Sequence, residues 1–260
     1  MGLVMAKGKL ILVGLGISDE KGISLAGLQA LKASGKIFAE SYTNLLPEGT
    51  LERLEKLVGK KIELLARAAV EDEKILLASS EKQVTALVVP GDPMIATTHV
   101  SLVLATKKKK IPVEIFHASS IISAAIGESG LQAYKFGKTV TLAYWRENYT
   151  PMAAYDIIAE NLARGLHTLL LLDIDEKLGA MRPNEAAKLL LEMEKKGGKK
   201  ILMPETNVIR LQNIGRKPQA VSYCQLSSLS EMPSVHAGPA VLVIPAKLHF
   251  LEEEFLLSLS

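Results

Sequence analysis

The chain of 260 residues is 48% hydrophobic and 23% charged, which is typical of a globular protein and excludes a disordered one, and its length suits one large domain or two ordinary ones. The formal net charge of +3 is too small to indicate a nucleic-acid partner by itself. The single cysteine, Cys224, excludes an intrachain disulfide framework and fits a reducing compartment, and no stretch approaches the roughly 18 apolar residues that a membrane span needs. We therefore expect a cytoplasmic protein without a membrane segment.

The N-terminal half alternates two patterns. Short β-branched runs predict strands buried on both faces, and the stretches between them predict helices. The predicted strands are 9–14, 36–40, 61–66, 85–90 and 113–117, and the predicted helices are 24–34, 50–59, 71–82 and 96–110. This alternation predicts an α/β layer with a mostly parallel sheet.

A second series begins at residue 139 and becomes dense in strands toward its end. The predicted strands are 139–144, 167–174, 199–204, 207–215, 220–229 and 240–245, and the predicted helices are 153–165, 183–198 and 251–259. Closely spaced strands with short connections favour a mixed, partly antiparallel sheet. The fold class is therefore α/β with two α/β domains, which we expect over residues 1–138 and 139–260.

Two glycine-bearing turns follow predicted strands of the first domain. Gly14 and Gly16 end the first strand, and "PGDP" places Gly91 and Asp92 after the fourth. Ligands of open α/β sheets bind at the carboxyl ends of the strands, and glycine there allows a ligand to approach the backbone closely. Because Asp19 stands where the dinucleotide fingerprint needs its third glycine, we do not expect a nicotinamide cofactor. Plain structural turns remain the alternative.

The sequence lacks the patterns of a serine nucleophile and of a metal site. The serine-rich stretch after residue 117 lacks Gly-x-Ser-x-Gly, so its hydroxyls either cap a helix or contact a ligand. His99 and His117 have no metal-ligand spacing, and we expect no metal site. The residues identify no catalytic group.

Several blocks together resemble a known family. "VGLGISD", "ESYT" (40–43), "PGDPMIATTH", "HASSIISAAIGESGLQAYKFG", "GLHTLLLLDI" and "IPAKLHF" occur in the order found in the archaeal diphthine synthases, members of the tetrapyrrole methylase-like superfamily. The resemblance implies two α/β domains, S-adenosylmethionine (AdoMet) in the cleft between them, and a homodimer. The cofactor contacts that it implies are Ile17, Asp92, Ile95, Ser120, Ile121, Leu172, Ile214 and Ala240.

The match is weaker at the C-terminal end of this set. Ile214 lies in a strand that only loosely matches the family's pattern, and Ala240 stands where the family usually has a histidine. His236 lies four residues before that position.

The resemblance also implies the reaction. A diphthine synthase transfers methyl groups from AdoMet to the amino group of 2-(3-amino-3-carboxypropyl)histidine on translation elongation factor 2, and archaeal members make the trimethylated product. One alternative is C-methylation of a tetrapyrrole precursor by a member of the same superfamily. An alternative of another class is a nucleic-acid-binding module that uses Lys107 to Lys110.

Overall fold

The computed structural model describes residues 8–40, 42, 46–175, 177–233 and 238–259 and divides into two compact units, Met1–Ile121 and Ile122–Ser260. The division lies earlier than residue 138, where the sequence places it, so the segment 122–138 is part of the second unit. None of the helices in the described ranges is both long and apolar enough to cross a membrane.

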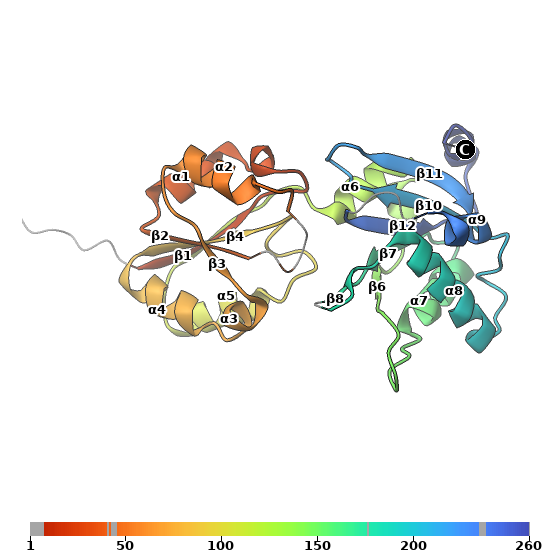
Figure 1. Cartoon of the computed structure of the whole chain (residues 1–260), viewed down its shortest axis with the longest axis horizontal. Coiled ribbons are helices and arrows are strands. Elements are labelled where there is room, and N and C mark those ends of the chain that lie inside the picture. Colours follow the sequence, from red (N-terminus) through yellow and green to blue (C-terminus); the bar gives the residue numbers. More distant parts are fainter. Residues whose placement is uncertain (1–7, 41, 43–45, 176, 234–237, 260) are drawn as a thin grey trace, which may run out of the picture. The chain divides into compact units, whose positions relative to one another are not determined.

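The first unit is built on a five-stranded sheet in the order β3-β2-β4-β1-β5, in which every ladder is parallel. Helices cover both faces, as Figure 1 shows for α1 and α2 on one side and for α3 to α5 on the other. The strands are β1 Lys9–Gly14, β2 Lys36–Glu40, β3 Glu63–Leu65, β4 Val84–Val89 and β5 Val113–Phe116. The helices are η1 Glu20–Gly22, α1 Leu25–Ala33, α2 Thr50–Val58, α3 Arg67–Glu71, α4 Lys74–Lys82 and α5 Val100–Lys108.

Alternate residues of each central strand feed two different cores. Ile11 and Val13 of β1 pack with α1 and α2, whereas Leu10 and Leu12 pack on the face that α4 and α5 cover. Because side chains of a strand alternate between faces, a strand buried on both sides needs apolar residues at every position. This explains why β1 and β4 are continuous apolar runs.

Two of the predicted helices differ from the structure. The stretch 71–82 is interrupted at Glu73, whose φ of 60° is left-handed, and α3 ends before it. The stretch 96–110 becomes helical only at Val100, because Ala96 also has a left-handed backbone, with φ 56°. The residues between Gly91 and Val100 therefore form a loop at the edge of the sheet.

The second unit has a mixed five-stranded sheet in the order β11-β10-β12-β7-β6, with β6 and β7 parallel and the other pairs antiparallel. The two α/β units with these sheets confirm the predicted fold class. The strands are β6 Val140–Leu142, β7 Thr168–Leu172, β8 Ile174–Asp175, β9 Gly179–Ala180, β10 Asn207–Gln212, β11 Ala220–Gln225 and β12 Ala240–Ile244. The helices are α6 Ile121–Glu128, η2 Ala133–Lys135, α7 Ala153–Ala163, α8 Pro183–Gly197, α9 Leu226–Glu231 and α10 Phe250–Leu257.

The strand predicted over 199–204 does not form, and the reason is a buried carboxylate. Glu194 accepts hydrogen bonds from the backbone N–H groups of Lys200, Ile201 and Leu202 at 2.6 to 2.8 Å. A strand would need these N–H groups for a neighbouring strand, so the segment instead wraps the end of α8. The prediction was also wrong for 226–229, which begin α9.

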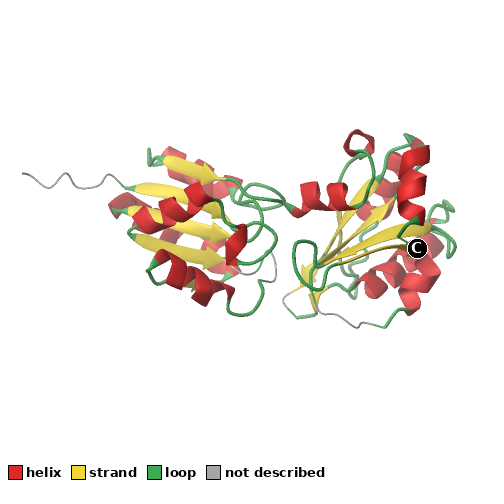
Figure 2. Ribbon diagram, turned by 90° about the horizontal axis from the view of Figure 1, so that it is seen from above, coloured by secondary structure: helices red, strands yellow, loops and turns green. Residues whose placement is uncertain are grey.

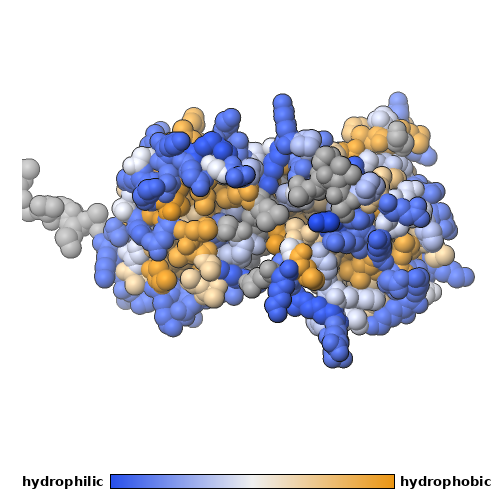
Figure 3. Space-filling model, viewed as in Figure 1, coloured by the Kyte–Doolittle hydropathy of each residue, from blue (hydrophilic) through white to orange (hydrophobic). Residues whose placement is uncertain are grey.

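Apolar side chains remain exposed on the C-terminal helix. Figure 3 shows this apolar surface near the end of the chain. The exposed apolar residues of α10 are Phe250, Leu251, Phe255 and Leu257.

Candidate functional site

The two glycine loops of the first unit meet at the edge of the sheet. The N–H of Gly16 donates to the carbonyl of Gly91 at 3.1 Å, and the N–H of Gly91 donates to the carbonyl of Gly16 at 2.8 Å. Figure 2 shows the strands of this sheet ending at one edge, where the loops gather. The connection from β1 leads toward β2, while the connection from β4 crosses to β5 on the other side of β1. The loops therefore meet at a topological switch point, where open α/β sheets bind ligands.

The glycines of these loops differ in what surrounds them. A Cβ on Gly14 would lie 2.6 Å from the carbonyl oxygen of Gly91 and 2.8 Å from the Cβ of Ala118, so Gly14 lets three loops pack closely. A Cβ on Gly91 would have no atom within 4 Å, and its φ of +76° is left-handed. The backbone at Gly91 thus faces open space, which a ligand can approach.

The carboxylate of Asp92 is buried and bound to protein donors. Oδ1 accepts from the N–H of Met94 at 2.9 Å. Oδ2 accepts from Nδ1 of His117 at 2.8 Å and from the N–H of Ala118 at 3.2 Å. Because these donors lie in the loops after β4 and β5, Asp92 joins the two loops. Direct acceptance of a hydrogen bond from AdoMet, which the sequence suggests for this residue, stays a prediction.

Behind the Gly-Asp-Pro turn lies a second buried polar pair. His99 places Nδ1 2.8 Å from the carbonyl oxygen of Pro93 and Nε2 3.1 Å from Oε2 of Glu40, the last residue of β2. Burial alone would lower the pKa of His99, but the hydrogen bond and charge of Glu40, with the Pro93 carbonyl, raise it above the ordinary value. The ring ties the turn to the end of β2.

Tyr42 lies two residues beyond the end of β2. Burial and the neighbouring Glu40 carboxylate raise the pKa of Tyr42 far above the ordinary tyrosine value, so the phenol stays protonated at neutral pH. Ser41 and Thr43 of the same "ESYT" block lie outside the described residues.

The structure brings together the predicted contacts of the first unit. Ile17 follows the Gly-Leu-Gly turn after β1, and Ile95 is 43% exposed in the loop after β4. Ser120 and Ile121 follow the end of β5. All of them, with Asp92, lie at the carboxyl edge of the parallel sheet.

The predicted contacts of the second unit share one edge of its sheet. Ala240 begins β12 and pairs with Gln212 at the end of β10, while the next residue, Val241, pairs with Leu171 of β7. Leu172, the last residue of β7, is therefore beside Ala240, and Ile214 is two residues beyond the end of β10. Ile214 is 5% exposed, so its side chain is part of the core. His236 lies outside the described residues.

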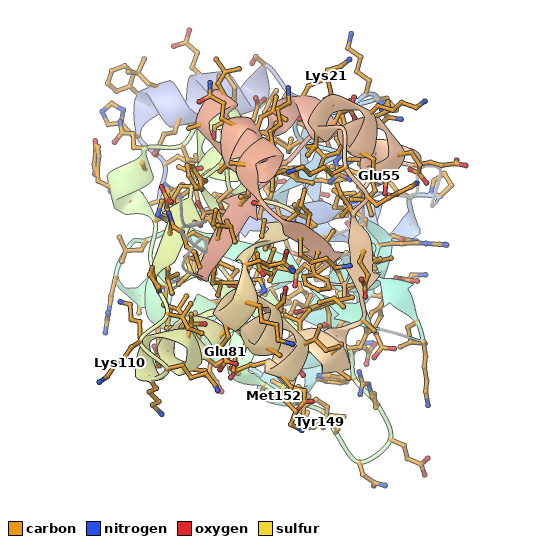
Figure 4. All side chains as sticks on the ribbon, turned by 90° about the vertical axis from the view of Figure 1, so that its left-hand side faces the viewer. Lys21, Glu55, Glu81, Lys110, Tyr149 and Met152 are labelled. Atoms are coloured by element: carbon orange, nitrogen blue, oxygen red, sulfur yellow. The ribbon has the colours of Figure 1, made fainter. Side chains whose placement is uncertain are left out.

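The basic run at the C-terminal end of α5 has the features of a solvated helix end. Lys107 to Lys110 are exposed, and Lys110 points outward in Figure 4. Lys109 forms an ion pair with Glu81 at 2.7 Å. Lysines at a helix C-terminus complement the helix dipole, which accounts for the run without a nucleic-acid partner.

Comparison with known proteins identifies the family of this chain. The model of the tetrapyrrole (corrin/porphyrin) methylases matches residues 9–230. The diphthine synthase of Methanocaldococcus jannaschii is 42% identical, with 95% of this chain and 97% of the relative covered, and that of Methanothermobacter thermautotrophicus is 35% identical over 96% and 95%. A crystal structure of diphthine synthase superimposes with a TM-score of 0.86 at 30% identity, over 96% of this chain and 95% of the other. The chain belongs to the diphthine synthase family.

Membership in the diphthine synthase family establishes the class of chemistry. The protein is an AdoMet-dependent methyltransferase of diphthamide biosynthesis, and AdoMet is its methyl donor. Relatives matched over nearly the full length are diphthine synthases, so this function is favoured over tetrapyrrole methylation and nucleic-acid binding.

The residues at the carboxyl edge of the first unit fit AdoMet. The open space at Gly91 admits a ligand to the backbone, and the exposed Ile95 offers apolar surface for a nucleoside. Sequence reasoning found Gly91 because it stands in a recognisable turn after a predicted strand, and it found Ile95 through the family resemblance. It missed Glu40 as a partner of His99 and His117 as a partner of Asp92, which only the sheet brings together.

Proposed function

We propose that this protein methylates the amino group of 2-(3-amino-3-carboxypropyl)histidine on translation elongation factor 2, and that the trimethylated side chain is the end product. The observation that carries the proposal is similarity to diphthine synthases over nearly the whole chain, which includes the loops at the switch point. We place the reaction in the cytoplasm, where elongation factor 2 acts.

The proposed cofactor contacts come from both units. The first unit contributes residues at the carboxyl edge of its sheet, namely Ile17, Asp92, Ile95, Ser120 and Ile121. The second unit contributes Leu172, Ile214 and Ala240. Since the Ile214 side chain is buried, we assign its contribution to the backbone.

The protein's part in this chemistry is mainly positioning. AdoMet, when bound, supplies a methyl group on a sulfonium, which is already a good leaving group. The reciprocal hydrogen bonds of Gly16 and Gly91 hold the loops after β1 and β4 together. Asp92 holds the loop after β5 to the same edge. A rigid edge of this kind aligns the acceptor amine with the methyl group and so reduces the entropic cost of reaction.

Mass spectrometry tests the proposed function. Elongation factor 2 that carries the unmethylated precursor is incubated with the protein and AdoMet, and the modified histidine is then examined. We expect methyl groups to be added, and we expect Asp92→Ala to abolish the gain. If the wild-type protein binds AdoMet and adds no methyl group, the acceptor is another molecule, and tetrapyrrole precursors are the next to assay.

We also propose that the protein is a homodimer. The exposed apolar side chains of α10 support this proposal, because monomers rarely leave such residues grouped on one helix. Sedimentation analysis would give twice the 28.1 kDa mass of one chain for a dimer. A mass of one chain across the micromolar range contradicts the proposal.

A further inference from the structure

One histidine at the edge of the first sheet combines an exposed ring with a buried partner. His117 follows β5, and its side chain is 66% exposed, whereas the side chain of Asp92 is only 5% exposed. The contact joins Nδ1 of His117 to Oδ2 of Asp92 at 2.8 Å. A carboxylate accepts hydrogen bonds, so Nδ1 carries a proton, and in the neutral ring the lone pair is on Nε2.

The orientation of the ring is set by the rest of the Asp92 network. The N–H groups of Met94 and Ala118 donate to the same carboxylate, so Asp92 is held on both oxygens. Ala118 is the residue after His117, and its N–H therefore fixes the backbone beside the ring. A ring held through Nδ1 presents Nε2 to solvent in a defined direction.

The other titratable groups at this edge have different partners. His99 is buried, and both of its ring nitrogens lie at acceptors, so it cannot exchange protons with a ligand. Among the described residues, Asp92 is the titratable group that contacts the His117 ring. Other titratable groups near this edge also have partners: Asp19 accepts from the N–H of Lys21, and the ion pairs or hydrogen bonds are Glu20 with Arg53, Glu40 with His99 and Arg67 with Glu71.

We propose that His117 is the general base of the methyl transfer and that Asp92 is its positioning residue. The inference rests on the proposed function, because the methyl acceptor there is an amine. An amine is mostly an ammonium ion at neutral pH and has no lone pair to attack with until a proton leaves. A positioned imidazole with a carboxylate behind it acts as a general base in other enzymes.

The proton and electron balance of each transfer is simple. The ammonium gives one proton to Nε2 of His117, and the freed lone pair forms a C–N bond with the methyl carbon. The C–S bond breaks at the same time, and its electron pair remains on sulfur, which leaves as a neutral thioether. His117 passes the proton to water before the next transfer. After the third transfer the nitrogen has no proton left, so the base has no further substrate.

The first readout needs no turnover. In the protein labelled with ¹⁵N in its histidines, we expect the His117 ring to show a proton on Nδ1 and none on Nε2 at pH values where it is neutral. The Asp92→Asn variant should lose this preference, because an amide can donate to Nδ1 instead of accepting from it. A ring with its proton on Nε2 in the wild-type protein contradicts the proposal.

The second readout compares His117→Asn with wild type. The amide nitrogen of asparagine can replace Nδ1 as donor to Asp92 but cannot accept a proton, so folding and AdoMet binding should be retained. We expect the dissociation constant of AdoMet by calorimetry to change by less than about twofold, and methyl transfer to elongation factor 2 to slow by about 100-fold or more. The remaining rate should rise about tenfold per pH unit, since the ammonium must then lose its proton to water before it can attack. Added imidazole should restore part of the rate.

A matched control uses the same substitution at another histidine. His249 is the N-cap of α10 and accepts from the N–H of Leu251, a role that asparagine performs well. His249→Asn should therefore leave both binding and transfer unchanged.

The possible outcomes separate the two proposals. A His117→Asn variant with the wild-type rate overturns the general base and leaves the methyltransferase function intact. If His117→Asn loses AdoMet affinity by the same factor as it loses rate, and imidazole does not restore the rate, the role of His117 is structural. That result also overturns the general base. A wild-type protein that adds no methyl group to elongation factor 2 overturns the proposed function and the base together.

Discussion

Nε2 of His99 lies 3.1 Å from Oε2 of Glu40, the last residue of β2, and both side chains are at most 1% exposed. The opposite nitrogen of the ring lies 2.8 Å from the Pro93 carbonyl. With acceptors on both sides, the ring is satisfied fully only as an imidazolium. The pair joins β2 to the turn that carries Asp92.

Titration of His99 is expected to follow this arrangement. In the wild-type protein its pKa should lie above the ordinary 6.5, and in Glu40→Gln it should fall, since burial alone lowers it. Because the folded-state pKa is the higher one, the stabilisation by the pair is complete below about pH 6.5 and is lost as the pH rises through the folded-state value. An NMR titration of the imidazole in the wild-type protein and in Glu40→Gln checks the direction. A His99 that titrates lower in the wild-type protein than in Glu40→Gln contradicts it.

Substitution of Gly91 by alanine should have two separate effects, backbone strain that lowers stability and a loss of AdoMet binding. Gly91 and Gly59 both have left-handed backbones, with φ of +76° and +74°, and neither would place a Cβ within 4 Å of another atom. Alanine at either position should lower the free energy of unfolding by a similar amount, about 1 to 2 kcal/mol. Only Gly91→Ala should also weaken AdoMet binding, because Gly59 ends α2 away from the loops. Urea unfolding and calorimetry measure the two effects, and equal AdoMet affinity in both variants would count against the ligand approach at Gly91.

Asp92→Asn should impair the site in two ways. The amide keeps one acceptor oxygen for the donors Met94, Ala118 and His117, so at least one buried group loses its partner, at a cost of about 1 to 3 kcal/mol. The amide nitrogen can also donate to Nδ1 of His117 and move its proton to Nε2. We expect methyl transfer to fall by more than AdoMet affinity does. The measurement is the ratio between the loss of methyl-transfer rate and the loss of AdoMet affinity. Equal losses would mean that the loop as a whole has shifted.

Glu252 should control the acid stability of the second unit. Burial alone would raise its pKa, but the N–H groups of His249 and Gln132, with Lys135 and His167, lower it to about 2. The stabilisation is therefore present above the ordinary value of about 4.5 and is lost as the pH falls from there to about 2. Since Glu252 is 1% exposed, the shift corresponds to roughly 3 kcal/mol at neutral pH.

The test compares a buried and an exposed glutamate of α10. Glu252→Gln should lower the thermal midpoint at pH 7 and leave it close to that of wild type near pH 2. Glu254→Gln, at an exposed position, should leave the midpoint unchanged at both pH values. A Glu252→Gln deficit that persists unchanged at pH 2 would exclude ionisation as its cause.

The strands of the first unit were readable from the sequence, whereas long-range polar partners were not. β1 and β2 appear as predicted because a strand buried on both faces must be apolar throughout. Gly91 and Asp92 were recognised as candidates because ligands of open α/β sheets bind at the carboxyl ends of the strands, with a plain turn as the alternative. Glu194 was invisible, since a glutamate near a helix end reads as a solvated residue. Its burial depends on N–H groups that approach only once the chain has turned back.

The paired hydrogen bonds between Gly16 and Gly91 also have a kinetic consequence. Neither N–H can exchange with solvent until the partner loop moves away, so both amides must wait for the same opening event. Their hydrogen exchange should therefore report one opening free energy, although 75 positions separate them in the printed sequence. The loops after β1 and β4 then open together, and a ligand that slows the opening of one loop slows the opening of both.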